Sequence, residues 1–217
     1  MGKRREFLGQ LAAVATAMSL DAAELRAASK EAGSKWDTSW LDEIATAKYR
    51  VVFNASNVSE GAAMSYAAEF FDQYHEVHDT VDKDTRPVIV FRRMGTVMAL
   101  NDAMWAKYAI GESRKITDSA THAPAVRNVF WKAAPGASPD ASSEKIDTLR
   151  TRGLISLVCN IALGSVAYGF AERTKTDVEA VQAEVRANII PGAFIVPSGI
   201  FGLIRAQNAG CAYMEGT

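Results

Sequence analysis

Apolar residues gather in five short runs along the chain, and most of these runs are continuously hydrophobic rather than alternating. Continuous runs of this length are typical of strands in a parallel sheet that is covered on both faces. The sequence therefore predicts five strands in one mainly parallel sheet. They lie at residues 49–53, 87–91, 154–158, 193–196 and 211–214.

Between these runs, apolar side chains recur at helical intervals, as on the stripe formed by Met64, Ala68 and Phe71. Thr176 opens a Thr-Asp-Val-Glu capping box, which indicates a helix N-terminus. Strands and helices therefore alternate, which predicts an α/β fold of three layers with helices on both faces of a five-stranded sheet. The other predicted helices cover residues 61–78, 98–108, 160–172 and 198–209.

Residues 116–143 interrupt this alternation. They contain Pro124, Pro135 and Pro139 among several Ala, Ser and Gly residues, and they show no sustained period. Loops of this length in compact domains are usually lids, contact arms or mobile segments. We expect a long excursion over the surface with one short helical turn.

The first residues carry an export pattern. Arg4 and Arg5 are followed, after one spacer, by Phe-Leu and a mildly apolar segment, which is typical of a twin-arginine signal peptide. The alternative interpretation is an amphipathic helix that belongs to the fold. The apolar run is too short for a permanent membrane span, which needs roughly 20 residues, and small residues fit cleavage after Ala17.

We therefore expect export to the periplasm, or otherwise out of the cytoplasm, and no membrane association after processing. The predicted parts are a signal peptide at 1–17, a polar lead-in at 18–48 and one domain at 49–217.

Composition disfavours several classes of protein. The formal net charge is −1 with Lys and Arg scattered along the chain, which argues against a nucleic-acid partner. Two cysteines and three histidines without a C-x-x-C pair disfavour a disulfide scaffold and a structural zinc site. No P-loop, G-x-G-x-x-G, G-x-S-x-G or H-E-x-x-H motif occurs. No cofactor is evident from these patterns.

The C-terminal sequence resembles a known family. Residues 190–201 read Ile-Pro-Gly-Ala-Phe-Ile-Val-Pro-Ser-Gly-Ile-Phe and lead to Gly210-Cys-Ala-Tyr, while residues 157–160 read Leu-Val-Cys-Asn. This order resembles the DsrE-like sulfur-relay family, and residues 92–108 look like an exported branch of it. The resemblance implies a DsrE-like fold, a trimer or hexamer, and a persulfide sulfur carried on one cysteine.

Cys159 is the candidate for that chemistry. It ends an apolar run and precedes a predicted helix, so it should lie at the carboxyl edge of the sheet, where open α/β folds bind ligands. The positive end of the helix dipole favours a thiolate, the form that attacks sulfane sulfur. The other interpretation is a small buried hydrophobe. Cys211 starts the last run, at the opposite edge, so the two cysteines should not form a disulfide.

Polar residues follow the same strand ends. Arg92 and Arg93 could stabilise a thiolate or bind an anionic sulfur species, although a surface ion pair would also explain them. Asn54 and Ser56 follow the first strand, and Asn160 follows Cys159. We take all five as candidate ligand-binding residues, while noting that Asn and Ser are also ordinary turn formers.

His75 and His78 stand three residues apart near the end of the first predicted helix, so both imidazoles lie on one helical face. Such a pair could bind a metal or a haem. Histidines at a helix C-terminus also interact favourably with its dipole, which is the plainer explanation.

Two functions remain open from the sequence. The first is an exported protein that binds or relays a small sulfur species through Cys159. The alternative is a non-catalytic oligomeric module that binds a small ligand, metal or haem at the sheet edge or at a subunit interface.

Overall fold

Five strands form one parallel sheet in the computed structural model of the protein, which describes residues 35–217. The spatial order is β6-β5-β2-β1-β7, and each neighbouring pair is parallel. The predicted five-stranded parallel sheet is therefore confirmed. The strands are β1 (Tyr49–Ala55), β2 (Thr85–Phe91), β5 (Ile155–Cys159), β6 (Phe194–Val196) and β7 (Ala212–Glu215).

The predicted signal peptide at 1–17 and the first half of the predicted lead-in lie outside the described residues. Residues 37–217 form one compact unit. Within the described part of the chain, no helix is both long enough and apolar enough to cross a membrane.

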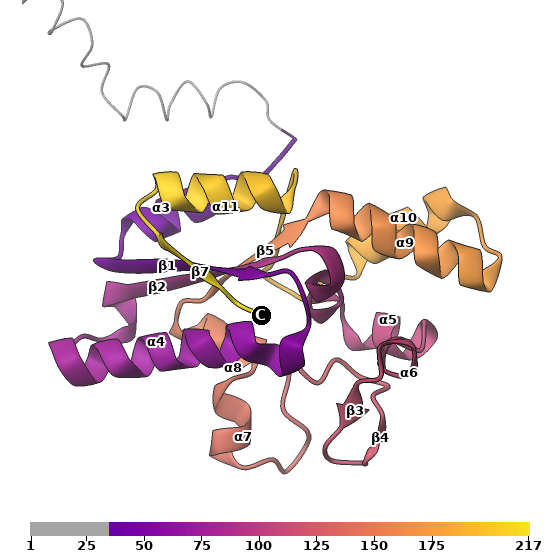
Figure 1. Ribbon diagram of the computed structural model, residues 1–217, viewed down its shortest axis with the longest axis horizontal. Coiled ribbons are helices and arrows are strands. Elements are labelled where there is room, and N and C mark those ends of the chain that lie inside the picture. Colours follow the sequence, from indigo (N-terminus) through magenta and orange to yellow (C-terminus); the bar gives the residue numbers. More distant parts are fainter. Residues whose placement is uncertain (1–34) are drawn as a thin grey trace, which may run out of the picture. The chain divides into compact units, whose positions relative to one another are not determined.

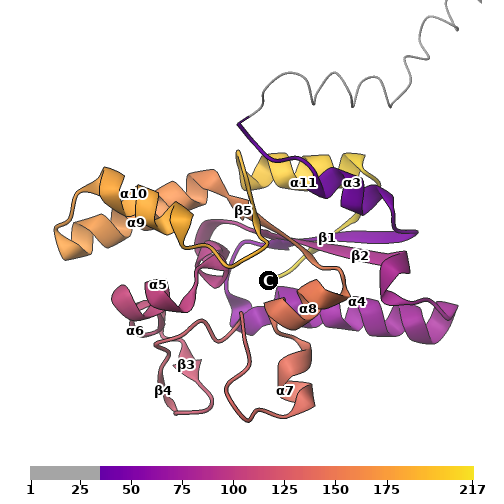
Figure 2. The same ribbon diagram turned by 180° about the vertical axis from the view of Figure 1, so that it is seen from behind.

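Helices cover both faces of the sheet, as Figures 1 and 2 show from opposite sides. On one face lie α3 (Trp40–Ala45) and α11 (Gly199–Asn208), and on the other lie α4 (Ala62–His78) and α8 (Ile146–Arg152). The expected arrangement of three layers is therefore present.

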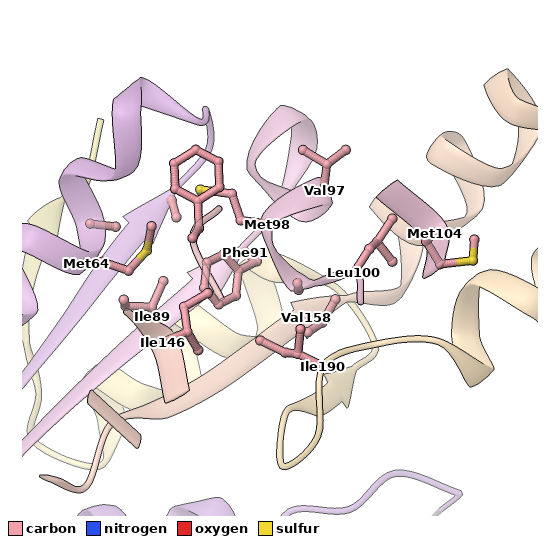
Figure 3. Packing of buried hydrophobic residues seen from close by; sticks show 14 of the residues in the cluster. Met64, Ile89, Phe91, Val97, Met98, Leu100, Met104, Ile146, Val158 and Ile190 are labelled. Atoms are coloured by element: carbon pink, nitrogen blue, oxygen red, sulfur yellow. The ribbon is translucent and has the colours of Figure 1, made fainter. Parts of the chain in front are cut away.

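Strand β2 contributes apolar side chains to the hydrophobic clusters on both faces of the sheet. Val88 and Val90 belong to the cluster under α3 and α11, whereas Ile89 and Phe91 belong to the cluster on the α4 side, because successive side chains of a strand point to opposite faces. All four side chains are fully buried. Figure 3 shows the larger cluster, with Ile89 and Phe91 close to Met64, Met98, Ile146 and Val158.

The helix predicted at 98–108 begins later than expected. Residues Arg93–Ala99 form 3₁₀ turns (η3), and α5 (Asp102–Lys107) starts only after Asn101. The Asn101 side chain accepts a hydrogen bond from the backbone N–H of Met104 at 3.2 Å. Such a cap satisfies a donor that the first helical turn leaves free, and it fixes the start of the helix.

Two longer helices follow β5, and they lie beside the carboxyl end of the sheet (Figure 1). They are α9 (Asn160–Thr174) and α10 (Val178–Ala187). The capping box predicted at Thr176 is displaced by one residue, because Asp177 is the N-cap of α10. Its carboxylate accepts a hydrogen bond from the backbone N–H of Ala180 at 2.9 Å.

The segment 116–143 is not simply a surface excursion. Asn128 is fully buried, and Phe130 is only 8% exposed and belongs to the main core cluster. The expected short helical turn is present as α7 (Pro139–Ser143). The other short elements are η1 (Ser59–Gly61), η2 (Asp82–Asp84), α6 (Ile110–Arg114), β3 (Thr117–Asp118) and β4 (Ala123–Pro124).

Candidate functional site

A cleft of about 540 Å³ opens at the carboxyl end of the sheet, where β2, β5 and β6 end. Ligands of open parallel α/β sheets bind at this edge. Cys159 lines the cleft together with Arg92, Arg93 and Arg114. The site thus combines one thiol with three guanidinium groups. The thiol comes from the end of β5, Arg92 and Arg93 directly follow β2, and Arg114 ends α6.

Cys159 is held at the junction between a strand and a helix. It is the last residue of β5 and the N-cap of α9, and its Sγ accepts a hydrogen bond from the backbone N–H of Ala162 at 3.4 Å. The thiol is free, and the residue is 6% exposed. Its sulfur therefore lies at the positive end of a helix of 15 residues, and the residue lines the cleft.

Arg92 is fixed in place by two neighbouring elements. Its guanidinium donates a hydrogen bond from Nη1 to Oδ1 of Asn54 at 3.3 Å. Its aliphatic part lies against Gly199, the first residue of α11, where an added Cβ would stand 2.8 Å from Cβ of Arg92. Glycine therefore allows the N-terminus of α11 to approach Arg92 closely.

The turn after Arg92 has a strained start. Arg93 adopts a φ of 49°, in the left-handed region that residues with a Cβ seldom occupy. Two hydrogen bonds stabilise this turn. The backbone carbonyl of Ser56 accepts them from the N–H groups of Met94 at 3.1 Å and Gly95 at 3.3 Å. A Cβ at Gly95 would lie only 2.2 Å from the carbonyl oxygen of Ala55. This close packing holds the exposed side chain of Arg93 at the rim of the cleft.

Arg114 is a charged cleft residue that sequence reasoning missed, and the apolar residues Met94, Ile161 and Ile200 were missed as well. Arg114 ends α6, a helix of five residues with no recognisable periodicity, so no sequence signal placed it at the sheet edge. Its Nη1 lies 3.4 Å from Sδ of Met94. Burial, followed by the positive charge of Arg173, lowers the pKa of the Arg114 guanidinium.

None of the three cleft arginines takes part in an ion pair among the described residues. The ion pairs of that part of the chain join other side chains, such as Arg127 with Asp118 and Arg152 with Asp72. Neither Arg92 nor Arg93 therefore forms an ion pair within this part of the chain, although the charge of Arg92 contributes to lowering the pKa of Glu215. Three guanidinium groups around one cleft make it a candidate site for an anion.

The other polar candidates lie outside the lining of this cleft. Asn54 is 6% exposed and donates from Nδ2 to both carboxylate oxygens of Glu215, at 3.1 and 3.0 Å, so it links β7 to Arg92. Ser56 contributes its backbone carbonyl to the turn described above. Asn160 accepts a hydrogen bond from Nε of Arg186 at 3.0 Å, which ties α9 to α10.

The two histidines of α4 lie at the opposite end of the sheet. The ring of His78 stacks on Tyr49, the first residue of β1, with centroids 5.2 Å apart. Nε2 of His75 lies 3.2 Å from Oδ1 of Asp82. Each imidazole thus has its own partner, and residues 35–217 contain no group of three or more His, Cys, Asp or Glu side chains suited to a metal.

Cys211 lies just before β7, and it is free and 6% exposed. Burial raises the pKa of its thiol to about 11, although the charge of Arg50 acts in the opposite direction. A thiol of this kind is almost entirely protonated at neutral pH and is a poor nucleophile. The two cysteines therefore have different chemical environments.

Comparison with known proteins adds little to this picture. No family model matches the chain, and no curated protein matches it. The chain is similar to a solved structure described as a protein of unknown function, MTH1491, from Methanobacterium thermoautotrophicum, with 16% identity and a TM-score of 0.37. The match covers 77% of this chain and 98% of that one. What the protein does is therefore inferred from the chemistry of the cleft.

Proposed function

We propose that the protein binds a small anionic sulfur species in this cleft and carries its sulfur on Cys159. One observation carries the proposal: the thiol shares a single cleft with three arginines, none of which forms an ion pair with a carboxylate among the described residues. The arginines attract an anion into the cleft that Cys159 lines. The N-terminus of α9, with its partial positive charge, also favours an anion there.

Loading sulfur onto Cys159 needs no reactant other than the sulfur donor, and passing it on needs an acceptor thiol. With thiosulfate, the Cys159 thiolate attacks the outer sulfur and forms a new S–S bond. The S–S bond of thiosulfate breaks, and sulfite leaves with the bonding electron pair. The product is a persulfide anion on Cys159. An acceptor thiolate then attacks its outer sulfur, and the Cys159 thiolate leaves.

The proposal includes the DsrE-like resemblance, export and self-association. The resemblance rests on residues 157–160 and 190–213, which supply the end of β5 and the start of α11 on two sides of the cleft. Export rests on the paired arginines at positions 4 and 5. Fractionation of cells tests export, and light scattering tests a trimer or hexamer.

Intact-mass spectrometry tests the sulfur transfer. Protein treated with thiosulfate or polysulfide should gain the mass of one sulfur atom, and a reductant should remove it. Cys159→Ser should gain nothing, whereas the matched variant Cys211→Ala should behave like the native protein. A sulfur adduct that persists in Cys159→Ser, or no adduct on the native protein, rejects the relay.

A second candidate is an anion-binding module without covalent chemistry. It is favoured by the hydrogen bond from Ala162 to Cys159 Sγ and by the low exposure of that residue, because both fit a cysteine that merely caps α9. In that case calorimetry should show that the cleft binds thiosulfate, but the mass of the intact protein should not change.

A further inference from the structure

The cleft has large apolar side chains in its walls as well as three arginines. Ile161 stands in the first turn of α9 and Ile200 in the first turn of α11, so two helices present an isoleucine to the same cleft. They are 65% and 60% exposed, and Met94 is 44% exposed. Large apolar side chains gathered around a cleft are typical of a surface that is covered by a ligand or partner.

The size of the cleft also exceeds what an inorganic sulfur ion needs. One water molecule takes up about 30 Å³ of liquid volume, so an ion of a few atoms fills a small part of the space. The cleft measures about 540 Å³, which is within the range of pockets that hold organic ligands. Such pockets combine apolar walls with a few placed polar groups, as this one does.

The charges specify the other half of the ligand. Arg93 and Arg114 line the cleft without ion-pair partners among the described residues, and Arg114 is partly buried. A buried positive charge without a counterion is unfavourable, and a bound anion would offset it. Arg92 donates to Asn54 and acts on the charge of Glu215, whereas Arg114 contacts only the weak acceptor Sδ of Met94. Arg93 and Arg114 are therefore freer to contact a ligand.

We propose that the ligand of the cleft is an organic persulfide that carries an anionic group, with its carbon body on Ile161 and Ile200 and its anion on Arg93 and Arg114. The identity of the sulfur group rests on the proposed function. In the transfer, the Cys159 thiolate attacks the outer sulfur of the persulfide, the S–S bond of the donor breaks, and the organic thiolate leaves with the bonding pair.

The predicted ligand class can be tested without sulfur chemistry. The probes are straight-chain carboxylates from acetate to octanoate, measured by calorimetry on the full-length Cys159→Ser variant. We expect one site per chain and an affinity that rises by about two- to fourfold for each added methylene group, because each one removes apolar surface from water. Octanol, which has the same chain without the charge, should bind at least about tenfold more weakly than octanoate.

Three further variants assign the two halves of the site. Ile161→Asn should flatten the dependence on chain length, because it removes an apolar wall and leaves the charges intact. Arg114→Gln should weaken every acid by a similar factor, because it removes charge and leaves the walls intact. Val77→Asn is the matched control, since Val77 is 71% exposed on α4 and does not line the cleft; it should change neither property.

Three results would overturn the predicted ligand class: an affinity independent of chain length, thiosulfate binding as tight as octanoate binding, or an equal loss of octanoate affinity in Val77→Asn and Ile161→Asn. Each of these leaves the sulfur-adduct experiment unaffected, since that experiment uses inorganic donors and native Cys159. Failure of the ligand class and failure of the relay are therefore distinguishable.

Discussion

Helix α11 begins against Arg92 because residue 199 is a glycine. A Cβ at Gly199 would stand 2.8 Å from Cβ and 2.9 Å from Cδ of Arg92, closer than such atoms pack. The guanidinium group of Arg92 and the N-terminus of α11 can therefore occupy the same side of the cleft. From the sequence, this glycine is only an early residue of a predicted helix. In the structure, its missing side chain makes room for Arg92.

Gly199→Ala should displace Arg92 or the start of α11. We expect the free energy of unfolding to fall by about 1–3 kcal/mol, as in other overpacked sites, and the affinity for thiosulfate or octanoate to fall as well. Gly164→Ala is the matched control. A Cβ there meets nothing within 4 Å, and alanine is the better helix former, so α9 should be unchanged or slightly more stable. Urea denaturation and calorimetry give both quantities, and equal behaviour of the two variants would contradict the steric explanation.

The two cysteines should differ in their rate of alkylation. Burial raises the pKa of the Cys211 thiol to about 11, so this residue should stay unmodified by iodoacetamide at about pH 8. Cys159 lines the cleft and should react. Mass spectrometry should therefore find one modification on the native protein and none on Cys159→Ser. Modification of Cys211 in the folded protein, or no modification at all, would refute this difference.

Asn128 should be essential for the stability of the 116–143 segment. Its fully buried amide donates to the carbonyl oxygens of Met98 and Leu100, both at 2.7 Å, and its Oδ1 accepts from the N–H groups of Phe130 and Trp131. Asn128→Asp has nearly the same shape but cannot donate to the two carbonyls.

We expect Asn128→Asp to lower the free energy of unfolding by about 3 kcal/mol or more, because it leaves buried carbonyl groups unsatisfied and buries a charge. Urea denaturation measures this loss, with Ser119→Ala, an exposed residue of the same segment, as the control. A change as small as that of the control would show that the amide is dispensable.

Stability should also depend on pH through Asp118, whose carboxylate accepts hydrogen bonds from Nε of Arg127 at 2.7 Å and Nη2 at 3.0 Å. Burial raises the pKa of this carboxyl, but the hydrogen bonds from Arg127 and from the N–H of Ala120 outweigh it, so the pKa of Asp118 is lowered. The Asp118 carboxylate therefore contributes its full share to the free energy of unfolding above the ordinary carboxyl pKa of about 3.9, and this share is lost as the pH falls below that value.

Asp118→Asn removes this contribution. Its deficit in unfolding free energy should be about 1–3 kcal/mol near pH 6, and it should shrink as the pH falls below about 3.9 and the native carboxyl becomes protonated. Urea denaturation at a series of pH values checks this. A deficit that does not change with pH would assign the effect of the variant to packing alone.

The sheet and its carboxyl edge could be predicted from the sequence because they depend on local patterns. Continuous apolar runs located the strands, and the position of Cys159 between such a run and a helical segment placed it correctly at a strand end. The same reasoning placed Arg92 and Arg93 directly after β2, and both line the cleft with Cys159.

What could not be predicted depends on contacts between distant segments. Arg114 reaches the cleft because α6 folds back beside the turn of Met94, and Asn160 turns to Arg186 rather than to the cleft. Asn128 looked like a loop residue, yet its amide is satisfied by carbonyl groups of η3 and the residue that follows it. Tertiary packing decides these positions, and no local pattern encodes it.

The link from Glu215 through Asn54 to Arg92 has a consequence for how the protein assembles. Asn54 and Glu215 are separated by 161 positions along the chain, so the hydrogen bond between them forms only when β7 pairs with β1. Contacts between such remote segments are costly in loop entropy and form late in folding. An anion bound in the cleft that Arg92 lines will therefore favour the fully assembled sheet over partly folded states, and its protective effect should extend to the edge strand β7.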